Sequence, residues 1–231
     1  MNNYVIATIK PWNVSNSKKL TERFPNDTFY VINDKECLNT DYLKSIHPRF
    51  IFFPHWSWII PKEIYEKYEC VVFHMTDLPF GRGGSPLQNL LSRGIYETRI
   101  SAIKVTGGLD TGPVYMKEPV DISNGNADEI LKKISGIVFE RMIPRFLIED
   151  LVPVKQTGIP VVFKRRTSDQ SRIPDGLTQR QLYDFIRMLD GEGYPAAYLE
   201  MDNGKIYYRN ARIEGNILYA DAEFRKESGI E

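Results

Sequence analysis

The histidine at position 74 closes a short apolar run and opens a loop that is rich in glycine and proline. The run is CVVFH, Cys70–His74, and the loop after it reads MTDLPFGRGGSP. Its glycines, Gly81, Gly83 and Gly84, let a ligand approach the backbone closely. Ligands of an open parallel sheet bind at the carboxyl ends of the strands, where this histidine is expected to lie. An imidazole accepts and returns a proton near neutral pH, so the pattern favours proton transfer.

A base of this kind needs a second group that fixes its tautomer, and Asp110 is the candidate. It stands in VTGGLDTGPVY, flanked by glycines, in a loop between two expected strands. We therefore expect Asp110 to orient His74. The pair alone leaves a purely structural role open, because a single histidine at a strand end more often only satisfies packing and hydrogen bonding.

Several common cofactor and catalytic motifs are missing from the sequence. IKPWNVSN follows the first expected strand, where a dinucleotide-binding protein would carry G-x-G-x-x-G. There is no P-loop, no H-E-x-x-H and no G-x-S-x-G. The two cysteines, Cys37 and Cys70, lack metal-ligand spacing and are too few for a disulfide framework. We expect neither a dinucleotide cofactor nor a metal.

The composition is that of a globular protein without a preference for one sign of charge. The 231 residues are 42% hydrophobic and 26% charged, and 30 basic residues balance 30 acidic ones. This balance gives no net field toward nucleic acid. The sequence shows no signal peptide and no run of about 18 apolar residues. We expect a cytoplasmic protein without membrane contact.

Short apolar runs alternate with helical patterns in the first two thirds of the chain, as in βαβ units around a mostly parallel, Rossmann-like α/β sheet. The expected strands are Tyr4–Lys10, Thr28–Ile32, Arg49–Pro54, Cys70–His74, Arg99–Val105 and Pro113–Val120. The expected helices are Ser15–Phe24 with a serine cap, Asn39–His47, Pro61–Tyr68 with proline as its first residue, Ser85–Ser92 and Asp128–Leu151. Pro144 is expected to kink or split the last of these, because proline lacks the N–H that a helix interior needs.

The pattern changes after about residue 152. A short strand and an irregular connection precede an expected helix, Leu182–Leu189, and three β-like runs close the chain. These runs are Ala196–Met201, Lys205–Ile213 and Asn216–Phe224, joined by the turn sequences DNG and EGN. We expect a larger domain over residues 1–160 and a small C-terminal unit, one helix plus antiparallel β, over residues 161–231.

The two glycine-rich motifs together resemble those of the 10-formyltetrahydrofolate-dependent formyltransferases. HMTDLPFGRGGSPLQ matches the family pattern H-x-x-x-L-P-x-x-R-G-x-x-P, and GGLDTGPVY carries the D-T-G that follows one strand later. Two motifs in the right order are more specific than either alone. This family includes methionyl-tRNA formyltransferase and the sugar N-formyltransferases, and a looser resemblance covers most of the chain. It implies that residues 1–160 form the catalytic domain.

The resemblance implies an enzyme that transfers a formyl group from 10-formyltetrahydrofolate to a primary amine. His74 would relay the amine proton toward the folate nitrogen, and Asp110 would orient His74 and stabilise its charged form. The implied cofactor-binding residues are Trp58, Ile59, Ile60, Thr76, Asp77, Leu78, Pro79 and Arg82. For the three that would line the pterin pocket, ordinary core packing is an equal alternative.

The sequence departs from the family pattern at Val72, where the family usually has an asparagine two residues before the histidine. That asparagine is thought to hold the oxyanion, and valine cannot donate a hydrogen bond. Loss of one oxyanion donor typically costs a factor of about 10²–10³ in rate. We expect a substitute donor, a loop N–H or a water in preference to His55.

The charge balance decides the expected acceptor amine. Phosphate contacts dominate nucleic-acid affinity, so a net charge of zero disfavours tRNA. We expect a nucleotide-linked amino sugar instead. The resemblance implies one of the 4-amino-4,6-dideoxy type on UDP or dTDP, such as a pseudaminic-acid precursor for surface glycan or lipopolysaccharide biosynthesis. The residues expected to bind its diphosphate are Lys164, Arg165 and Arg166. For each of them taken alone, a solvated position at a strand end is the better explanation.

Three alternatives stay open on the sequence alone. They are a methionyl-tRNA formyltransferase-like enzyme, a formyltetrahydrofolate hydrolase with water in place of the amine, and a non-catalytic folate-binding protein suggested by Val72. The main interpretation expects no nucleic-acid partner. The sequence does not determine the oligomeric state and leaves a homodimer open.

Overall fold

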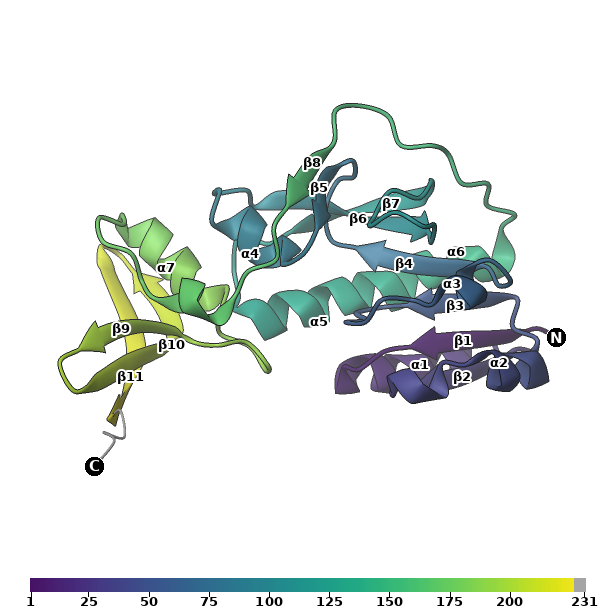
Figure 1. Cartoon of the computed structure of the whole chain (residues 1–231), viewed down its shortest axis with the longest axis horizontal. Coiled ribbons are helices and arrows are strands. Elements are labelled where there is room, and N and C mark those ends of the chain that lie inside the picture. The colour runs from purple at the N-terminus through teal and green to yellow at the C-terminus, as the bar shows by residue number, and fades with distance from the viewer. Residues whose placement is uncertain (227–231) are drawn as a thin grey trace. The chain divides into compact units, whose positions relative to one another are not determined.

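The chain divides into two compact units, each built from segments that lie far apart in the sequence (Figure 1). The structure is a computed structural model that describes residues 1–226. Unit 1 comprises residues 1–82, 98–120 and 132–162. Unit 2 comprises residues 83–97, 121–131 and, as far as it is described, 163–226. The domains expected over residues 1–160 and 161–231 stay a prediction.

A six-stranded sheet in the order β2-β1-β3-β4-β6-β7 forms the centre of unit 1. Its strands are β1 (Asn3–Ala7), β2 (Thr28–Ile32), β3 (Phe50–Phe53), β4 (Cys70–His74), β6 (Glu97–Lys104) and β7 (Val114–Asp121). The first four run parallel, and β6 pairs antiparallel with β4. The α/β class with a mostly parallel sheet is therefore confirmed.

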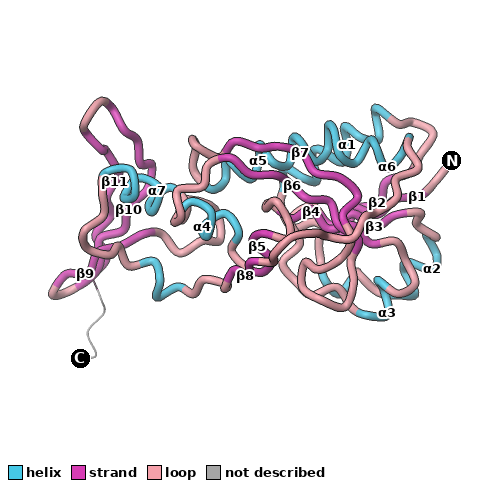
Figure 2. The backbone as a smooth tube through the Cα atoms, turned by 90° about the horizontal axis from the view of Figure 1, so that it is seen from above, coloured by secondary structure: helices cyan, strands magenta, loops and turns pink. Residues whose placement is uncertain are grey.

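Helices cover both faces of this sheet, as seen in Figure 2. α1 (Pro11–Arg23) and α6 (Ile143–Ile148) lie on one face, and α2 (Thr40–Ile46) and α3 (Lys62–Tyr65) lie on the other. The strands are apolar on both faces because each face is covered, which is the usual reason for near-continuous apolar runs in a parallel sheet.

The alternation of side chains along β1 divides the core of unit 1 into two layers. Val5 and Ala7 belong to a buried cluster with Leu43 of α2 and Ile64 of α3. Residues of the opposite parity form the second layer, an aromatic stack. In it, the ring of Tyr4 stacks on Phe52, and Phe52 meets Phe146 of α6 edge to face.

The long helix expected over Asp128–Leu151 is split, as Pro144 predicts. α5 (Ala127–Ile137) passes into a π-helical turn, η2 (Val138–Met142), and α6 continues from there. Pro144 has no N–H for the carbonyl four residues earlier, that of Glu140. The side chain of Arg23 donates to that carbonyl at 3.0 Å and so satisfies it.

Several element starts differ from the predicted ones. α1 begins at Pro11 and not at Ser15, because proline at the first helical position presets the backbone and needs no N–H partner. α3 is one turn long and starts at Lys62, with Pro61 as its cap residue. The first strand also ends earlier than expected, at Ala7.

Unit 2 contains α4 (Pro86–Leu91), the 3₁₀ turn η3 (Ser168–Ser171), α7 (Gln179–Arg187) and an antiparallel sheet in the order β11-β10-β9. The strands are β9 (Ala197–Met201), β10 (Gly204–Glu214) and β11 (Ile217–Lys226). Both hairpins expected at DNG and EGN are confirmed by the pairs Met201–Gly204 and Glu214–Ile217. α7 starts three residues before the expected Leu182, because Thr178 and Gln181 form a capping box.

The glycine-rich loop after His74 contains a strand that was not predicted, β5 (Phe80–Gly83). It pairs with β8 (Val161–Phe163) in a two-stranded sheet. Its glycine content hid it, since glycine is depleted in strands. Gly83 has φ of 106°, and a β-carbon there would lie 2.4 Å from the carbonyl oxygen of Phe163. Only glycine therefore permits this pairing.

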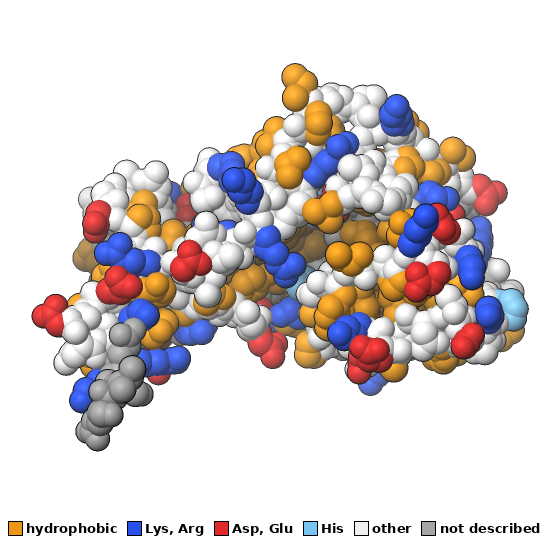
Figure 3. Space-filling view, viewed as in Figure 1, with side chains coloured by type: hydrophobic (Ala, Val, Ile, Leu, Met, Phe, Trp, Pro, Cys, Tyr) orange, Lys and Arg blue, Asp and Glu red, His pale blue; other side chains and the backbone are white. Residues whose placement is uncertain are grey.

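Charged side chains of both signs are interspersed on the face shown in Figure 3, and neither sign dominates it. Exposed ion pairs such as Arg145–Glu149 and Arg172–Glu200 show the same mixing at residue level. Pairs of this kind contribute little to stability. Within residues 1–226, no helix is long and apolar enough to cross a membrane.

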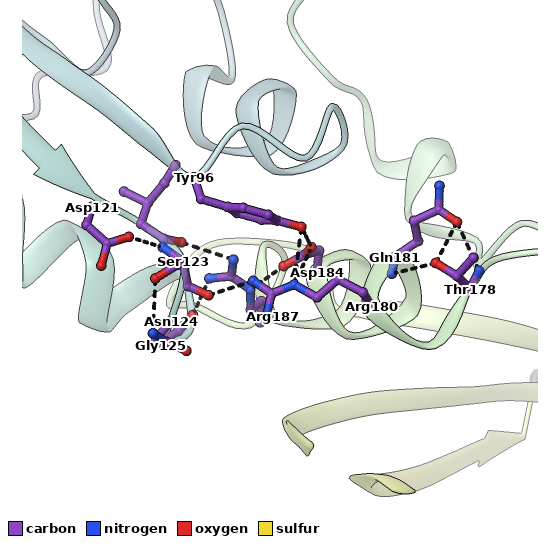
Figure 4. Close-up of polar contacts among 11 residues, drawn as sticks. Tyr96, Asp121, Ser123, Asn124, Gly125, Thr178, Arg180, Gln181, Asp184 and Arg187 are labelled. Carbon is purple, nitrogen blue, oxygen red and sulfur yellow. Dashed lines mark hydrogen bonds and ion pairs between the residues drawn. The ribbon is translucent and has the colours of Figure 1, made fainter. Parts of the chain in front are cut away.

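A buried arginine joins α7 to the turn at residues 121–125 in unit 2 (Figure 4). The guanidinium of Arg187 is almost completely buried and donates to Asp184 at 2.7 Å, to the carbonyl of Gly125 at 2.8 Å and to that of Ile122 at 3.0 Å. Asp184 also accepts from the hydroxyl of Tyr96 at 2.6 Å. Every ionised group buried here has hydrogen-bonding partners, as burial of charge requires.

Candidate active site

The structure brings His74 and Asp110 together at the carboxyl end of β4. His74 is the last residue of β4, and Asp110 lies in the connection between β6 and β7. The Nδ1 atom of His74 lies 3.6 Å from Oδ2 of Asp110, and their side chains are only 8% and 11% exposed. The proximity fits the expected base and orienting carboxylate, whose catalytic roles stay a prediction.

The loop that carries Asp110 is tightly constrained. Asp110 has φ of 52°, a left-handed conformation that non-glycine residues rarely adopt. Two residues later, a β-carbon on Gly112 would lie 1.7 Å from the carbonyl oxygen of Lys104. Glycine is thus the one residue type that fits there, and it fixes the course of the chain just after the carboxylate.

The second ring nitrogen of His74 is also engaged. Its Nε2 lies 2.7 Å from the carbonyl oxygen of Gly81, and the hydroxyl of Thr76 donates to the same oxygen at 3.3 Å. A carbonyl oxygen only accepts hydrogen bonds, so Nε2 carries a proton in this arrangement. For Nε2 to accept a proton from an amine, His74 must first lose the proton at Nε2 and leave the carbonyl of Gly81.

The loop expected to contact folate, Thr76–Pro79, is anchored by its backbone. The hydroxyl of Ser101 donates to the carbonyl of Thr76 at 2.7 Å and accepts from the N–H of Leu78 at 3.3 Å. The side chains of Thr76 and Leu78 are buried, while that of Asp77 is half exposed. Asp77 forms an ion pair with Lys117.

The three residues expected to line a pterin pocket have different surroundings. Trp58 is 40% exposed and its ring meets that of Trp56 edge to face at 4.8 Å. Ile59 is 93% exposed, whereas Ile60 belongs to the buried cluster under α2 and α3. Contact with a cofactor stays a prediction for all three, and Ile60 also serves core packing.

Arg82 has a partner that was not predicted, the side chain of Gln156. Its Nε and Nη2 atoms donate to Oε1 of Gln156 at 3.1 and 2.8 Å. The amide nitrogen of Gln156 donates in turn to the carbonyls of Asp110 and Gly112, both at 2.8 Å. Gln156 lies in an irregular connection where no periodicity or motif marks it, so its contact with Arg82 could not be predicted.

The basic cluster expected to bind the acceptor lies in unit 2. Lys164 and Arg165 are exposed, and Arg166 is partly buried with its guanidinium 5.6 Å from the ring centre of Phe185. Burial lowers the pKa of Arg166 from its usual range. The Nη2 atom of Arg166 also donates to the carbonyl of Gln170. A role for the three residues in acceptor binding stays a prediction.

Val72 occupies the position where the family pattern has asparagine. It lies two residues before His74 on β4, so both side chains point to the same face of the sheet. It is partly buried and packs against the cluster under α2 and α3. Its neighbours across the sheet are Phe53 and Ile103. The environment of Val72 is therefore apolar.

A family model described as Formyl transferase matches residues 16–136, just over half of the chain. The chain belongs to the formyl transferase family. This confirms the family inferred from the two motifs, and with it the folate-dependent formyltransferase class. The family's formyl donor is 10-formyltetrahydrofolate, as expected. A second model, described as methionyl-tRNA formyltransferase C-terminal domain, matches residues 168–225.

Individual relatives of this formyl transferase carry the same name repeatedly. A solved structure described as methionyl-tRNA formyltransferase from Clostridium thermocellum is 47% identical with a TM-score of 0.95, over 98% of this chain and 100% of that chain. The methionyl-tRNA formyltransferase of Caldicellulosiruptor saccharolyticus is 32% identical over 64% of this chain and 50% of its own. The chain spans about half the length of the curated relatives it matches.

The expectation of a nucleotide-linked amino sugar as acceptor, with no nucleic-acid partner, is wrong. The relatives at 47% and 32% identity are methionyl-tRNA formyltransferases. A solved sugar N-formyltransferase from a Shewanella species is 16% identical, with a TM-score of 0.70 over 91% of this chain and 97% of that chain, and shows the fold alone. Net charge is a poor guide to this acceptor, because nucleic acid is bound by local groups and a net charge of zero says nothing about where these groups lie.

The part of the chain that the structure describes holds no group of three or more histidine, cysteine, aspartate or glutamate side chains suited to a metal ion. Cys70 is buried, and burial raises the pKa of its thiol to about 12. A thiol with so high a pKa is a poor nucleophile at neutral pH. Of the groups considered from the sequence, His74 and Asp110 remain as the candidates for chemistry.

Val72→Asn is expected to change kcat for formyl transfer by less than about tenfold. Val72 packs among apolar neighbours, and an amide there costs free energy unless it finds a partner. If a different donor already holds the oxyanion, the new amide adds nothing. Steady-state kinetics of the variant, with Val72→Ala as the packing control, test this. A rise in kcat of tenfold or more with unchanged KM would show instead that the wild-type site lacks a donor.

Proposed function

We propose that this protein transfers the formyl group of 10-formyltetrahydrofolate to the amino group of methionyl-tRNA. The observation that carries the proposal is the 47% identity, over nearly all of both chains, with a structure described as methionyl-tRNA formyltransferase. The family match and the His74–Asp110 pair support it. A cytoplasmic location is part of the same proposal.

The reaction joins the amine nitrogen to the formyl carbon and breaks the bond between that carbon and the folate nitrogen. One proton must leave the amine, and one must reach the folate nitrogen. His74 takes the amine proton at Nε2 and passes it to the folate nitrogen, once the ring has released the carbonyl of Gly81 and holds its own proton at Nδ1. Asp110 faces Nδ1 at 3.6 Å, where a carboxylate orients the ring and stabilises the imidazolium that forms.

The formyl donor is proposed to bind beside the loop Thr76–Pro79. Because the side chains of Thr76 and Leu78 are buried, these residues act through their backbone. The exposed residues Trp58 and Ile59 are available to an apolar ring system. The complete proposed set for folate is the predicted one, Trp58, Ile59, Ile60, Thr76, Asp77, Leu78, Pro79 and Arg82.

The acceptor is proposed to contact the basic cluster of unit 2. Lys164 and Arg165 are exposed and present donors that phosphate groups accept readily. Arg166 is less free, because its guanidinium is held between Phe185 and the carbonyl of Gln170. Contacts of this kind weaken with added salt, since binding to a polyanion releases counterions.

The proposal is tested by incubating the protein with 10-formyltetrahydrofolate and charged initiator methionyl-tRNA. After hydrolysis of the ester, mass spectrometry measures N-formylmethionine. Uncharged tRNA and free methionine serve as acceptor controls. Formylmethionine from the charged tRNA alone is the expected result.

Two outcomes would contradict this function. Release of formate at the same rate with and without acceptor would identify a hydrolase. Tight binding of tetrahydrofolate, with no turnover of formyl-folate by any amine, would identify a non-catalytic folate-binding protein.

A further inference from the structure

We propose that Gln156 is a positioning residue that holds Asp110 against His74, an inference that rests on the proposed function. Gln156 is half-buried in the connection between α6 and β8. It lies 46 residues from Asp110 along the chain, yet its amide bonds to that residue's backbone. All the groups involved belong to unit 1.

The amide of Gln156 has a partner for each of its hydrogen-bonding directions. Nε2 donates one hydrogen to the carbonyl of Asp110 and one to the carbonyl of Gly112. Oε1 accepts two hydrogen bonds from Arg82. A guanidinium only donates and a carbonyl only accepts, so the partners fix which end of the amide faces which way. A glutamine with four such bonds has one orientation.

The backbone near Gln156 is fixed to the same loop that carries Asp110. Val154 and Val114 exchange two backbone hydrogen bonds, each of 2.8 Å, in an isolated antiparallel bridge. Val114 starts β7, two residues after Gly112. The connection that carries Gln156 is thus held against the start of β7, which limits how far the amide can move from the carbonyls that it binds.

Asp110 needs support of this kind. Its φ of 52° lies in the left-handed region, which costs a non-glycine residue on the order of 1–3 kcal/mol and persists only where the surroundings impose it. The amide of Gln156 binds the carbonyl of this very residue, so it acts directly on the peptide whose conformation is strained. The direction of the Asp110 side chain depends on that conformation.

The oxygen of the Gln156 amide is connected, through Arg82, to the loop that contacts Nε2 of His74. Arg82 directly follows Gly81, whose carbonyl holds Nε2 of His74. Gln156 therefore links the two loops that contact the imidazole, one at Nδ1 through Asp110 and one at Nε2 through Gly81. Two loops held by one amide keep a constant position relative to each other on either side of the ring.

The test is a double-mutant cycle with Asp110→Asn in the full-length protein. Gln156→Leu removes all four hydrogen bonds at similar volume, and we expect it to lower kcat at least tenfold with KM for 10-formyltetrahydrofolate changed less than about threefold. In the Asp110→Asn background the same change should cost less than about twofold, because the carboxylate that it positions is gone. Gln181→Leu in the capping box of α7 is the matched control and should leave kcat unchanged.

Equal losses from Gln156→Leu in both backgrounds would overturn the inference, because Gln156 would then act independently of Asp110. Retention of more than half of the wild-type kcat would overturn it as well. Should Gln156→Leu fail to fold, Gln156→Glu replaces it, since a carboxylate keeps the bonds to Arg82 and loses only the donors to Asp110 and Gly112.

A second readout separates this inference from the proposed acceptor. NMR follows the titration of the His74 ring. The chain has only three histidines to assign, and the measurement needs no substrate. Gln156→Leu should alter that titration in the same direction as Asp110→Asn. If wild-type protein makes no formylmethionine but this change is seen, the acceptor is wrong and the positioning role stands. An unaltered titration would refute the positioning role whatever the acceptor.

Discussion

Replacing His74 with asparagine is expected to lower kcat for formyl transfer by about 10²–10⁴-fold, the usual contribution of a positioned acid–base group. The amide of asparagine cannot take up and return a proton at neutral pH. The variant should fold normally, because the side chain is replaced by one that is polar and smaller. Rapid quenched assays with 10-formyltetrahydrofolate and methionyl-tRNA measure the rate.

His55→Asn is the matched control for this change. His55 lies just after the end of β3, and His74 is the last residue of the neighbouring strand β4. Both histidines therefore lie at the carboxyl edge of the same sheet. We expect the control to retain most of the activity, because a backbone N–H or a water is the favoured oxyanion donor. Activity above a tenth of wild type in His74→Asn would remove His74 from the chemistry. A crippled His55→Asn would make His55 the oxyanion donor.

The fold was largely predictable because local pattern and tertiary environment agree in most of the chain. Thr28–Ile32 and Cys70–His74 are apolar runs between turn signals, and both are strands with the expected bounds. Pro144 interrupts its helix because proline has no backbone N–H, a local property that can be read from the sequence. The misplaced start of α1 shows the limit, since serine and proline both signal a helix start and only the packed structure selects Pro11.

The approach of Asp110 to His74 could be anticipated because both lie in glycine-rich motifs at predicted strand ends. Gln156 could not, since its contacts depend on how an irregular connection folds back over the sheet. The acceptor was mispredicted for a different reason. Net charge is a sum over the whole chain, and recognition depends on where a few groups such as Lys164 and Arg165 lie.

The stability of unit 2 depends strongly on one buried guanidinium, and Arg187→Met is expected to lower the free energy of unfolding by about 3–5 kcal/mol. The side chain is 1% exposed and serves three acceptors, Asp184 and two backbone carbonyls (Figure 4). Methionine fills much of the volume, so lost packing contributes little. The carbonyls of Ile122 and Gly125 would lose this donor, and Asp184 would lose its strongest counterion while remaining buried.

Arg180→Met is the control that separates burial from charge. Arg180 also binds Asp184, at 3.1 Å, but it is 41% exposed, so water replaces its contacts and the loss should stay near 1 kcal/mol or below. Urea unfolding followed by circular dichroism gives both values, with an unchanged m-value as the sign that the same transition is compared. If Arg187→Met costs no more than Arg180→Met, the buried network adds only specificity to the fold, and the stability of unit 2 must come from other contacts, such as the packing of α7 against β10.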